Sequence, residues 1–227
     1  MKQEEYYNHI RSDLVDLIDF SNEELSILDI GCGTGATLKY IKSKYPNTKV
    51  YGIDSERKLD IKSDPSLNIT IADAQMINFI YDPETFDYII LGDIIEHLKE
   101  PLLFLHKVRN LLKNNGHIVC SIPNVANAKI IYELLHNQFT YTEVGLLDYA
   151  HLRFFTSYSF WDILEKSGFS IKKSFPRIVK GFRIDDYGDF FDNILSIEGV
   201  ASKQCFDAYQ ILFDAVKEEI NNDTLFH

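Results

Sequence analysis

The stretch LDIGCGTG, residues 28 to 35, places three glycines between a short apolar run and a segment with helical periodicity. Gly31, Gly33 and Gly35 would let backbone N–H groups approach a ligand, and the amino end of the following helix adds a partial positive charge. The stretch therefore predicts a nucleotide-type binding loop. A tight turn without a ligand also fits these residues, as does the GxGxxA form of a dinucleotide-binding loop, completed here by Ala36.

Apolar strand-like runs alternate with helical periodicity around this stretch, from residue 26 to about residue 171. Alternation of this kind is typical of a parallel sheet covered by helices. The expected strands are Ser26–Asp29, Lys49–Ile53, Ile69–Ile71, Tyr88–Leu91 and His117–Ser121. The expected helices are Glu5–Ile18, Thr34–Tyr45, Pro101–Lys113 and Tyr158–Ser167.

The alternation changes near the end of the chain, where a strand at Phe169–Phe175, a helix at Asp185–Ile197 and a strand at Ala208–Val216 are expected. A last strand that lacks an ordinary crossover helix can pair antiparallel with its neighbours. We therefore expect one α/β domain over residues 1–227, with a helical insertion at about 185–197. A second insertion, at about 124–156 with a helix near its middle, is expected to cover a binding crevice.

Composition restricts the classes of partner and compartment. The 227 residues carry 23 Lys and Arg against 34 Asp and Glu, a formal net charge of -11, which argues against a nucleic-acid partner. The three cysteines are far apart and lack CxxC spacing, so reduced thiols are expected. No apolar run approaches the roughly 18 residues that span a bilayer. A cytoplasmic protein, monomeric or homodimeric, is the expectation.

Acidic residues end each of the first four expected strands. Asp29 precedes the glycines, Asp54 lies about 20 residues beyond them, and Asp73 and Asp93 follow the next two strands. Parallel strands bring their carboxyl ends to one edge of a sheet, so these four carboxylates are expected to gather there. The spacing of Asp54 is that of an acid which accepts hydrogen bonds from a ribose diol.

With these features the chain resembles the class I S-adenosylmethionine-dependent methyltransferases, from about Tyr6 to Val216. The resemblance implies a Rossmann-like doubly wound sheet of about seven strands, mostly parallel with the last antiparallel, and S-adenosyl-L-methionine as the cofactor. The insertion at about 124–156 is expected to cover the methyl acceptor, and the helix at Asp185–Ile197 is, like it, a candidate acceptor cover or subunit contact. The implied cofactor contacts are Asp29, Gly31 and Gly33 beside the methionine part, Asp54 at the ribose, Asp73 and Ala74 at the adenine, and the backbone of Leu91 and Gly92 at the methionine amino group.

The segment GDIIEHL, residues 92 to 98, brings Asp93, Glu96 and His97 together where the methyl donor is expected to point. The same acids would also suit caps of the helix that begins near Pro101, and His97 would also suit a packed, hydrogen-bonded imidazole. A later segment, GLLDYAHLRFFT at residues 145 to 156, places His151 and Arg153 in apolar surroundings. Structural roles there would be a hydrogen bond for His151 and an acidic partner for Arg153.

The segments SIPNVAN (121–127), HLRFFT (151–156) and EHL (96–98) resemble those of enzymes found beside glycosyltransferases in bacterial surface-polysaccharide gene sets, and those of ubiquinone-type O-methyltransferases. In the first branch a Tyr/Arg helix closes over the cofactor, which implies contacts from Tyr7 and Arg11. The expected activity is therefore O-methylation of a small polar acceptor, such as a sugar or a polysaccharide precursor.

His97 and His151 are the candidate catalytic bases, because an imidazole titrates near neutral pH, and Asp93 or Glu96 would orient them. Glu96, His97 and His151 also resemble the metal-holding element of small-RNA 2′-O-methyltransferases, with Asp93 in place of the usual Glu. Since a positioned base suffices for a small hydroxyl, no metal is expected and activity should survive chelation. A nicotinamide-dependent oxidoreductase and a non-catalytic, S-adenosylmethionine-binding interaction subunit are the remaining alternatives.

Overall fold

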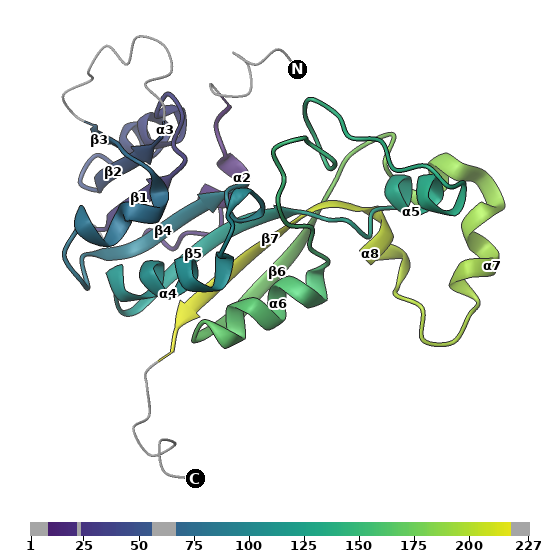
Figure 1. Ribbon diagram of the computed structural model, residues 1–227. Helices are drawn as coiled ribbons and strands as arrows, with labels where there is room; N and C mark the ends of the chain where they lie inside the picture. Colours follow the sequence, from purple (N-terminus) through teal and green to yellow (C-terminus); the bar gives the residue numbers. More distant parts are fainter. Residues whose placement is uncertain (1–8, 22–23, 56–66, 219–227) are drawn as a thin grey trace.

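The computed structural model describes residues 9–21, 24–55 and 67–218 of the chain. Its centre is a seven-stranded sheet in the order β3-β2-β1-β4-β5-β7-β6 (Figure 1). β7 pairs antiparallel with β5 and with β6, whereas β1, β2, β3, β4 and β5 pair in parallel. The mostly parallel sheet with an antiparallel last strand is thereby confirmed. The strands are β1 (Ser26–Ile30), β2 (Lys49–Asp54), β3 (Asn68–Ile71), β4 (Phe86–Gly92), β5 (Leu112–Pro123), β6 (Phe169–Ile178) and β7 (Ala208–Lys217).

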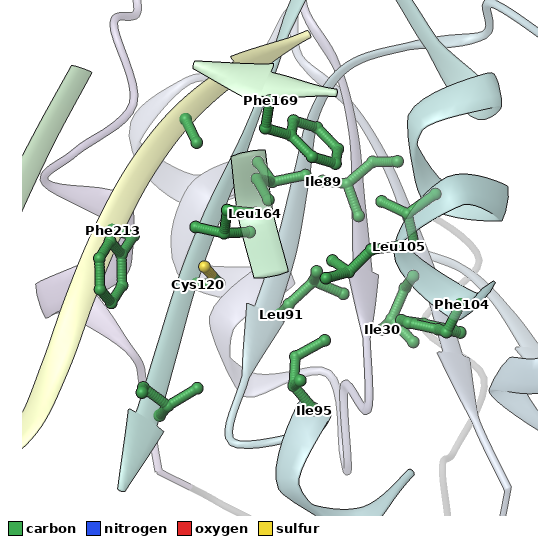
Figure 2. Close-up of a cluster of buried hydrophobic side chains, with 14 of the residues drawn as sticks. Ile30, Ile89, Leu91, Ile95, Phe104, Leu105, Cys120, Leu164, Phe169 and Phe213 are labelled. Atoms are coloured by element: carbon green, nitrogen blue, oxygen red, sulfur yellow. The ribbon is translucent and has the colours of Figure 1, made fainter. Parts of the chain in front are cut away.

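The central strands are apolar on both faces because helices cover both sides of the sheet. Along β4, Ile89 and Leu91 face one core and Ile90 faces the other. The first core packs under α4 (Pro101–Leu111) and α6 (Ser157–Lys166), and Figure 2 shows its side chains. The second core packs under α2 (Ser12–Val15) and α3 (Ala36–Lys44). None of the helices in the described part of the chain has the length and apolar character of a membrane-crossing segment.

Two expected helices differ from those observed. Residues 1–8 lie outside the described residues, and the described remainder of Glu5–Ile18 is helical only over Ser12–Val15. The expected helix at Asp185–Ile197 is instead a 3-10 segment, η3 (Ile184–Phe191), followed by α7 (Asp192–Leu195). Gly188, with φ +57° and ψ -140°, breaks this segment, since that backbone conformation cannot continue a helix.

The two insertions pack against each other and form a second lobe. α5 (Ala128–Leu135), η3, α7 and α8 (Lys203–Asp207) lie together beyond the end of β5 (Figure 1). Their shared apolar core is built from Ala128, Ile184, Phe191 and Phe206, all 7% exposed or less. The lobe therefore has a core of its own beside the sheet.

Two buried asparagines of the SIPNVAN segment attach this lobe to the start of β7. Asn124 Nδ2 donates to the carbonyl oxygens of Cys205 and Ala208, at 2.8 and 2.9 Å. Asn127 Nδ2 donates to three carbonyls, those of Phe182, Phe206 and Ala208, and its Oδ1 caps α5 by accepting from Lys129 N. These side chains thus supply donors to backbone carbonyls at the junction, and Ala208 O accepts from both of them.

Replacing Asn127 by Ala is expected to lower the free energy of unfolding by about 1–3 kcal/mol, because buried carbonyls lose their donor and α5 loses its cap. Urea denaturation measures this change. Asn193→Ala, at an exposed position in α7, is the matched control and should change stability little. Equal stabilities for the two variants would show that Asn127 does not hold the lobe.

Candidate functional site

Parallel pairing brings the carboxyl ends of β1, β2 and β4 to one edge of the sheet. Ile30 pairs with Ile53 of β2 on one side and with Leu91 of β4 on the other. The residues that follow, Gly31, Asp54 and Gly92, consequently emerge side by side. This register therefore places the ends of β1, β2 and β4 side by side, at the edge of the sheet where the sequence predicts the four carboxylates.

The glycine loop adopts a conformation that needs its glycines. Gly31, Gly33 and Gly35 have φ of +78°, +54° and +77°, the region in which a side chain is strained. A Cβ at Gly31 would lie 2.2 Å from Ile94 Cδ1. The loop is held from β2, because Gly31 N donates to Ile53 O at 2.7 Å and Gly33 N donates to Asp54 Oδ2 at 2.8 Å. Asp54 thus orients the loop and lies beside it.

Asp29 lies below the loop and is 6% exposed. Burial raises the pKa of the Asp29 carboxyl to about 7, the Arg11 guanidinium opposes that rise, and the neighbouring Asp54 carboxylate adds to it. This carboxyl is therefore poised near neutral pH. A cationic group bound above the loop would favour its charged form.

Asp73 and Ala74 follow β3 at the same edge. The Asp73 side chain is exposed and caps the 3-10 segment η1 (Ala74–Phe79) by accepting from Gln75 N at 2.8 Å. Ala72 N donates to Asp54 O at 2.9 Å, so the two strand ends are joined by backbone. The expected position of Asp73 near Asp54 follows from this pairing.

Asp93 accepts hydrogen bonds from three different side chains. Its Oδ1 accepts from Ser121 Oγ at 2.6 Å and from Gln210 Nε2 at 2.7 Å, and its Oδ2 accepts from Arg11 Nη1 at 3.1 Å. The backbone of Asp93 has φ +55°, which is unusual for a residue with a side chain and is held by these contacts. Asp93 therefore joins β4, β5, β7 and the N-terminal segment.

Arg11 covers the end of β4. Its guanidinium forms ion pairs with Asp13 at 2.9 Å and with Asp93 at 3.1 Å, and its Nη1 would lie 2.9 Å from a Cβ built on Gly92. Leu91 is fully buried beneath. Arg11 therefore lies beside Gly92, while Tyr7, the other residue of the expected Tyr/Arg helix, lies outside the described residues.

The EHL and HLR segments meet directly. Leu152 N and Arg153 N donate to Glu96 O at 2.8 and 3.0 Å, and His97 Nδ1 lies 3.1 Å from Ala150 O. These bonds fix the loop of residues 150–153 against the 3-10 turn η2 (Ile95–His97). Arg153 is exposed and donates to the Lys99 and Leu152 carbonyls, so its observed partners are not acidic.

Glu96, His97 and His151 form one cluster as a result. The two imidazole rings are 4.9 Å apart with an interplanar angle of 71°, and His151 Nε2 is 3.9 Å from Glu96 Oε1. Burial, reinforced by the Asp93 carboxylate, raises the pKa of the Glu96 carboxyl well above its usual range. Burial and the nearby His97 lower the pKa of His151. The cluster therefore offers a neutral imidazole beside an acid that is costly to ionise.

Two polar residues of the site, Ser121 and Gln210, were not among the candidate site residues expected from the sequence. Ser121 ends the expected strand His117–Ser121, so its position at the site edge was accessible from the strand pattern. Gln210 lies on β7, whose antiparallel direction brings its amino end to this edge. Nothing in the local sequence around Gln210 indicates that it bonds both oxygens of Asp93 at 2.7 Å.

Comparison with known proteins identifies the family of this chain and finds solved structures with the same fold. The family model described as "Methyltransferase domain" matches residues 3–174. N-methyltransferase 4 of Papaver somniferum is 32% identical over 96 residues, which are 39% of this chain and 27% of that protein. Demethylmenaquinone methyltransferase of Staphylococcus aureus (strain JH9) is 29% identical over 115 residues, 47% of this chain and 48% of that protein. The chain thus spans at most about half the length of these curated relatives.

Solved structures share the fold at low sequence identity. A SAM dependent methyltransferase from Archaeoglobus fulgidus has a TM-score of 0.64 and 19% identity, with 94% of this chain and 97% of that chain covered. The 1,6-didemethyltoxoflavin-N1-methyltransferase of Burkholderia thailandensis, with bound S-adenosylhomocysteine, has a TM-score of 0.59 and 13% identity, with 92% and 78% covered. Both agree with the Rossmann-like sheet.

Asp29→Asn is expected to stabilise the ligand-free protein at neutral pH and to do so less as the pH falls. The folded pKa is about 7 against an ordinary value of 3.8, so folding favours the protonated carboxyl and stability is lost as pH rises between these values. The loss is about 1.4 kcal/mol per pH unit and is absent in the asparagine variant.

Urea denaturation at pH 5, 6, 7 and 8 checks this expectation by comparing the variant with the parent chain. Asp82→Asn, at an exposed position, controls for the general effect of removing a charge. A stability difference that is the same at every pH would contradict the assigned titration of Asp29.

Proposed function

Because the chain belongs to the methyltransferase domain family, we propose that it transfers a methyl group from S-adenosyl-L-methionine to a hydroxyl of a small polar acceptor. A sugar or polysaccharide precursor is the acceptor class that the EHL and HLRFFT segments favour. The polysaccharide-cluster and ubiquinone-type O-methyltransferases are the branch to which we assign it. When bound, the cofactor supplies a sulfonium methyl group that an acceptor oxygen can take by displacement.

The carboxyl edge of the sheet fits this cofactor. The glycine loop runs through Gly31 and Gly33 at positive φ and carries no side chains at these two positions, so a ligand could approach its backbone closely. Asp54 would accept hydrogen bonds from the ribose hydroxyls, and Asp73 with Ala74 would contact the adenine. Asp29 and the Asp93 carboxylate, already paired with Arg11, favour the cationic methionine part by charge.

The observation that best supports a hydroxyl oxygen as the methyl acceptor is the pair of imidazoles beyond β4. His97 Nδ1 and His151 Nδ1 lie 3.1 and 3.2 Å from the carbonyl oxygens of Ala150 and Leu146. A carbonyl only accepts, so each Nδ1 carries the hydrogen, and in the neutral imidazole Nε2 then keeps a lone pair. These two groups suit an acceptor that must lose its proton, as a hydroxyl must.

The insertion at about 124–156 supports a small acceptor. Residues 150–153 reach the site from the 124–156 insertion and are fixed to Glu96 by backbone bonds, so this insertion lies over the candidate catalytic cluster. The net charge of -11 disfavours a substrate bound through many phosphates. An RNA 2′-O-acceptor is therefore the second candidate, favoured only by the Glu96, His97 and His151 group itself.

Asp54→Ala is expected to weaken binding of S-adenosylhomocysteine by about 1–3 kcal/mol, because the ribose loses a charged acceptor. Isothermal titration calorimetry measures the change, and Asp82→Ala is the exposed control. Asp54→Asn keeps an acceptor for Gly33 N and should lose less. Unchanged affinity in a folded Asp54→Ala protein would place the ribose elsewhere.

His97→Ala and His151→Ala are expected to leave cofactor affinity nearly intact and to lower turnover by about 100- to 10,000-fold, the usual loss when a general base is removed. The assay follows transfer of a labelled methyl group to a library of sugars, polysaccharide precursors, phenols, amines and RNA. His106→Ala, on the exposed face of α4, is the matched control.

Mass spectrometry of the product locates the methyl group. An O-methylated small molecule supports the proposal, whereas methylation of an amine, a carbon or RNA alone would contradict it. Variants that melt normally and turn over within a few-fold of the parent chain would remove both histidines from the mechanism and leave Asp93 and Glu96 to be tested.

A further inference from the structure

Glu96 is buried with no hydrogen-bond partner for its carboxylate oxygens among the described residues. The residue is 1% exposed, and both Oε1 and Oε2 are buried and unbonded. Removing a carboxyl group from water without such bonds costs several kcal/mol on the order-of-magnitude scale for buried polar groups. Buried polar atoms in native proteins nearly always have partners, so these oxygens indicate an additional ligand at this position.

The two histidines beside Glu96 are arranged as metal ligands usually are. Each Nδ1 is committed to a backbone carbonyl, that of Ala150 for His97 and that of Leu146 for His151. A hydrogen bond from Nδ1 to a carbonyl is the usual second contact of a metal-binding imidazole. It fixes the ring orientation and leaves Nε2 as an electron-pair donor. His151 Nε2 already lies 3.9 Å from Glu96 Oε1, too far for a hydrogen bond between them.

We propose that Glu96, His97 and His151 bind one divalent transition-metal ion. One ligand atom from each residue lies within 4.8 Å of those of the other two. Atoms that share one ion at bond lengths of about 2.1 Å are roughly 3–3.5 Å apart, so shifts of about 1 Å in side-chain position close the site. One carboxylate with two imidazoles suits Mn²⁺, Fe²⁺, Co²⁺ or Zn²⁺ better than Mg²⁺ or Ca²⁺.

Asp93 is excluded from the ligand set by its own contacts. Its oxygens accept from Ser121, Gln210 and Arg11, and Arg11 carries a positive charge that would repel the ion. Three protein ligands leave coordination positions open, as catalytic metal sites do. His97 is partly exposed, which gives the ion access from solvent.

This inference deepens the proposed function, because with an ion bound both Nε2 atoms would be ligands and no longer bases, and the ion would instead bind and acidify the acceptor hydroxyl. That role rests on the proposed function, whereas metal binding itself does not. It also replaces the expectation from the sequence that a positioned base suffices. The buried, unbonded oxygens of Glu96 and the shared orientation of the imidazoles are the observations that change it.

The test uses the full chain, stripped with chelator and titrated with MnCl₂, ZnCl₂ and CoCl₂ by calorimetry, without cofactor or acceptor. One ion per chain is expected, with visible absorption bands of Co²⁺ showing nitrogen ligation. Glu96→Gln, His97→Ala and His151→Ala should each weaken binding at least about tenfold, whereas His106→Ala should not. Thermal melts without metal establish that each variant is folded.

Absence of one-to-one binding to the parent chain overturns the proposal, and so does binding that survives Glu96→Gln and both histidine variants. If no ion binds yet the histidine variants still lose turnover, the metal site is wrong and the proposed function stands. If an ion binds and no methyl acceptor is found, the metal site stands and the proposed function fails.

Discussion

Parallel pairing of β1 with both β2 and β4 is the constraint on which the site depends. It places the glycine loop, Asp54 and Gly92 at one edge of the sheet. The same register buries Asp29 beneath the loop, where its carboxyl loses solvation. The fold thus gathers acids at this edge at a cost in stability, and a cationic ligand or partner lowers that cost.

Asp93 and Glu96 lie one turn apart and have opposite environments. Asp93 accepts hydrogen bonds from β5, β7 and the N-terminal segment, so its charge is compensated by Arg11. Glu96 lies beneath the 150–153 loop, and its backbone carbonyl, not its side chain, makes the bonds to that loop. This division gives Asp93 a structural and electrostatic role, whereas the oxygens of Glu96 have no hydrogen-bond partner among the described residues, as the proposed ion site requires.

Much of the fold could be predicted from the sequence because strand and helix periodicities follow burial closely. The glycine loop was recognisable from its three glycines after a strand, and the antiparallel β7 from the lack of an ordinary crossover helix before it. The break at Gly188 was not, because one glycine in an apolar, periodic segment fits a helix as well as a kink. The roles of Asn127 and Gln210 depend on partners about 80 and 117 residues away, which no local pattern encodes. For the candidate site, residue types and strand-end positions were predictable, whereas the unbonded state of Glu96 emerges only from packing.

The central claim is that the donor's methyl group points toward the Glu96, His97 and His151 cluster. A crystal structure of the full chain with S-adenosylhomocysteine bound tests it most directly. The account predicts the ribose at Asp54, the homocysteine part along the glycine loop, and the thioether sulfur directed past Gly92 toward the two imidazoles. A sulfur directed away from that cluster, with His97 and His151 on the far side of the ligand, would contradict it.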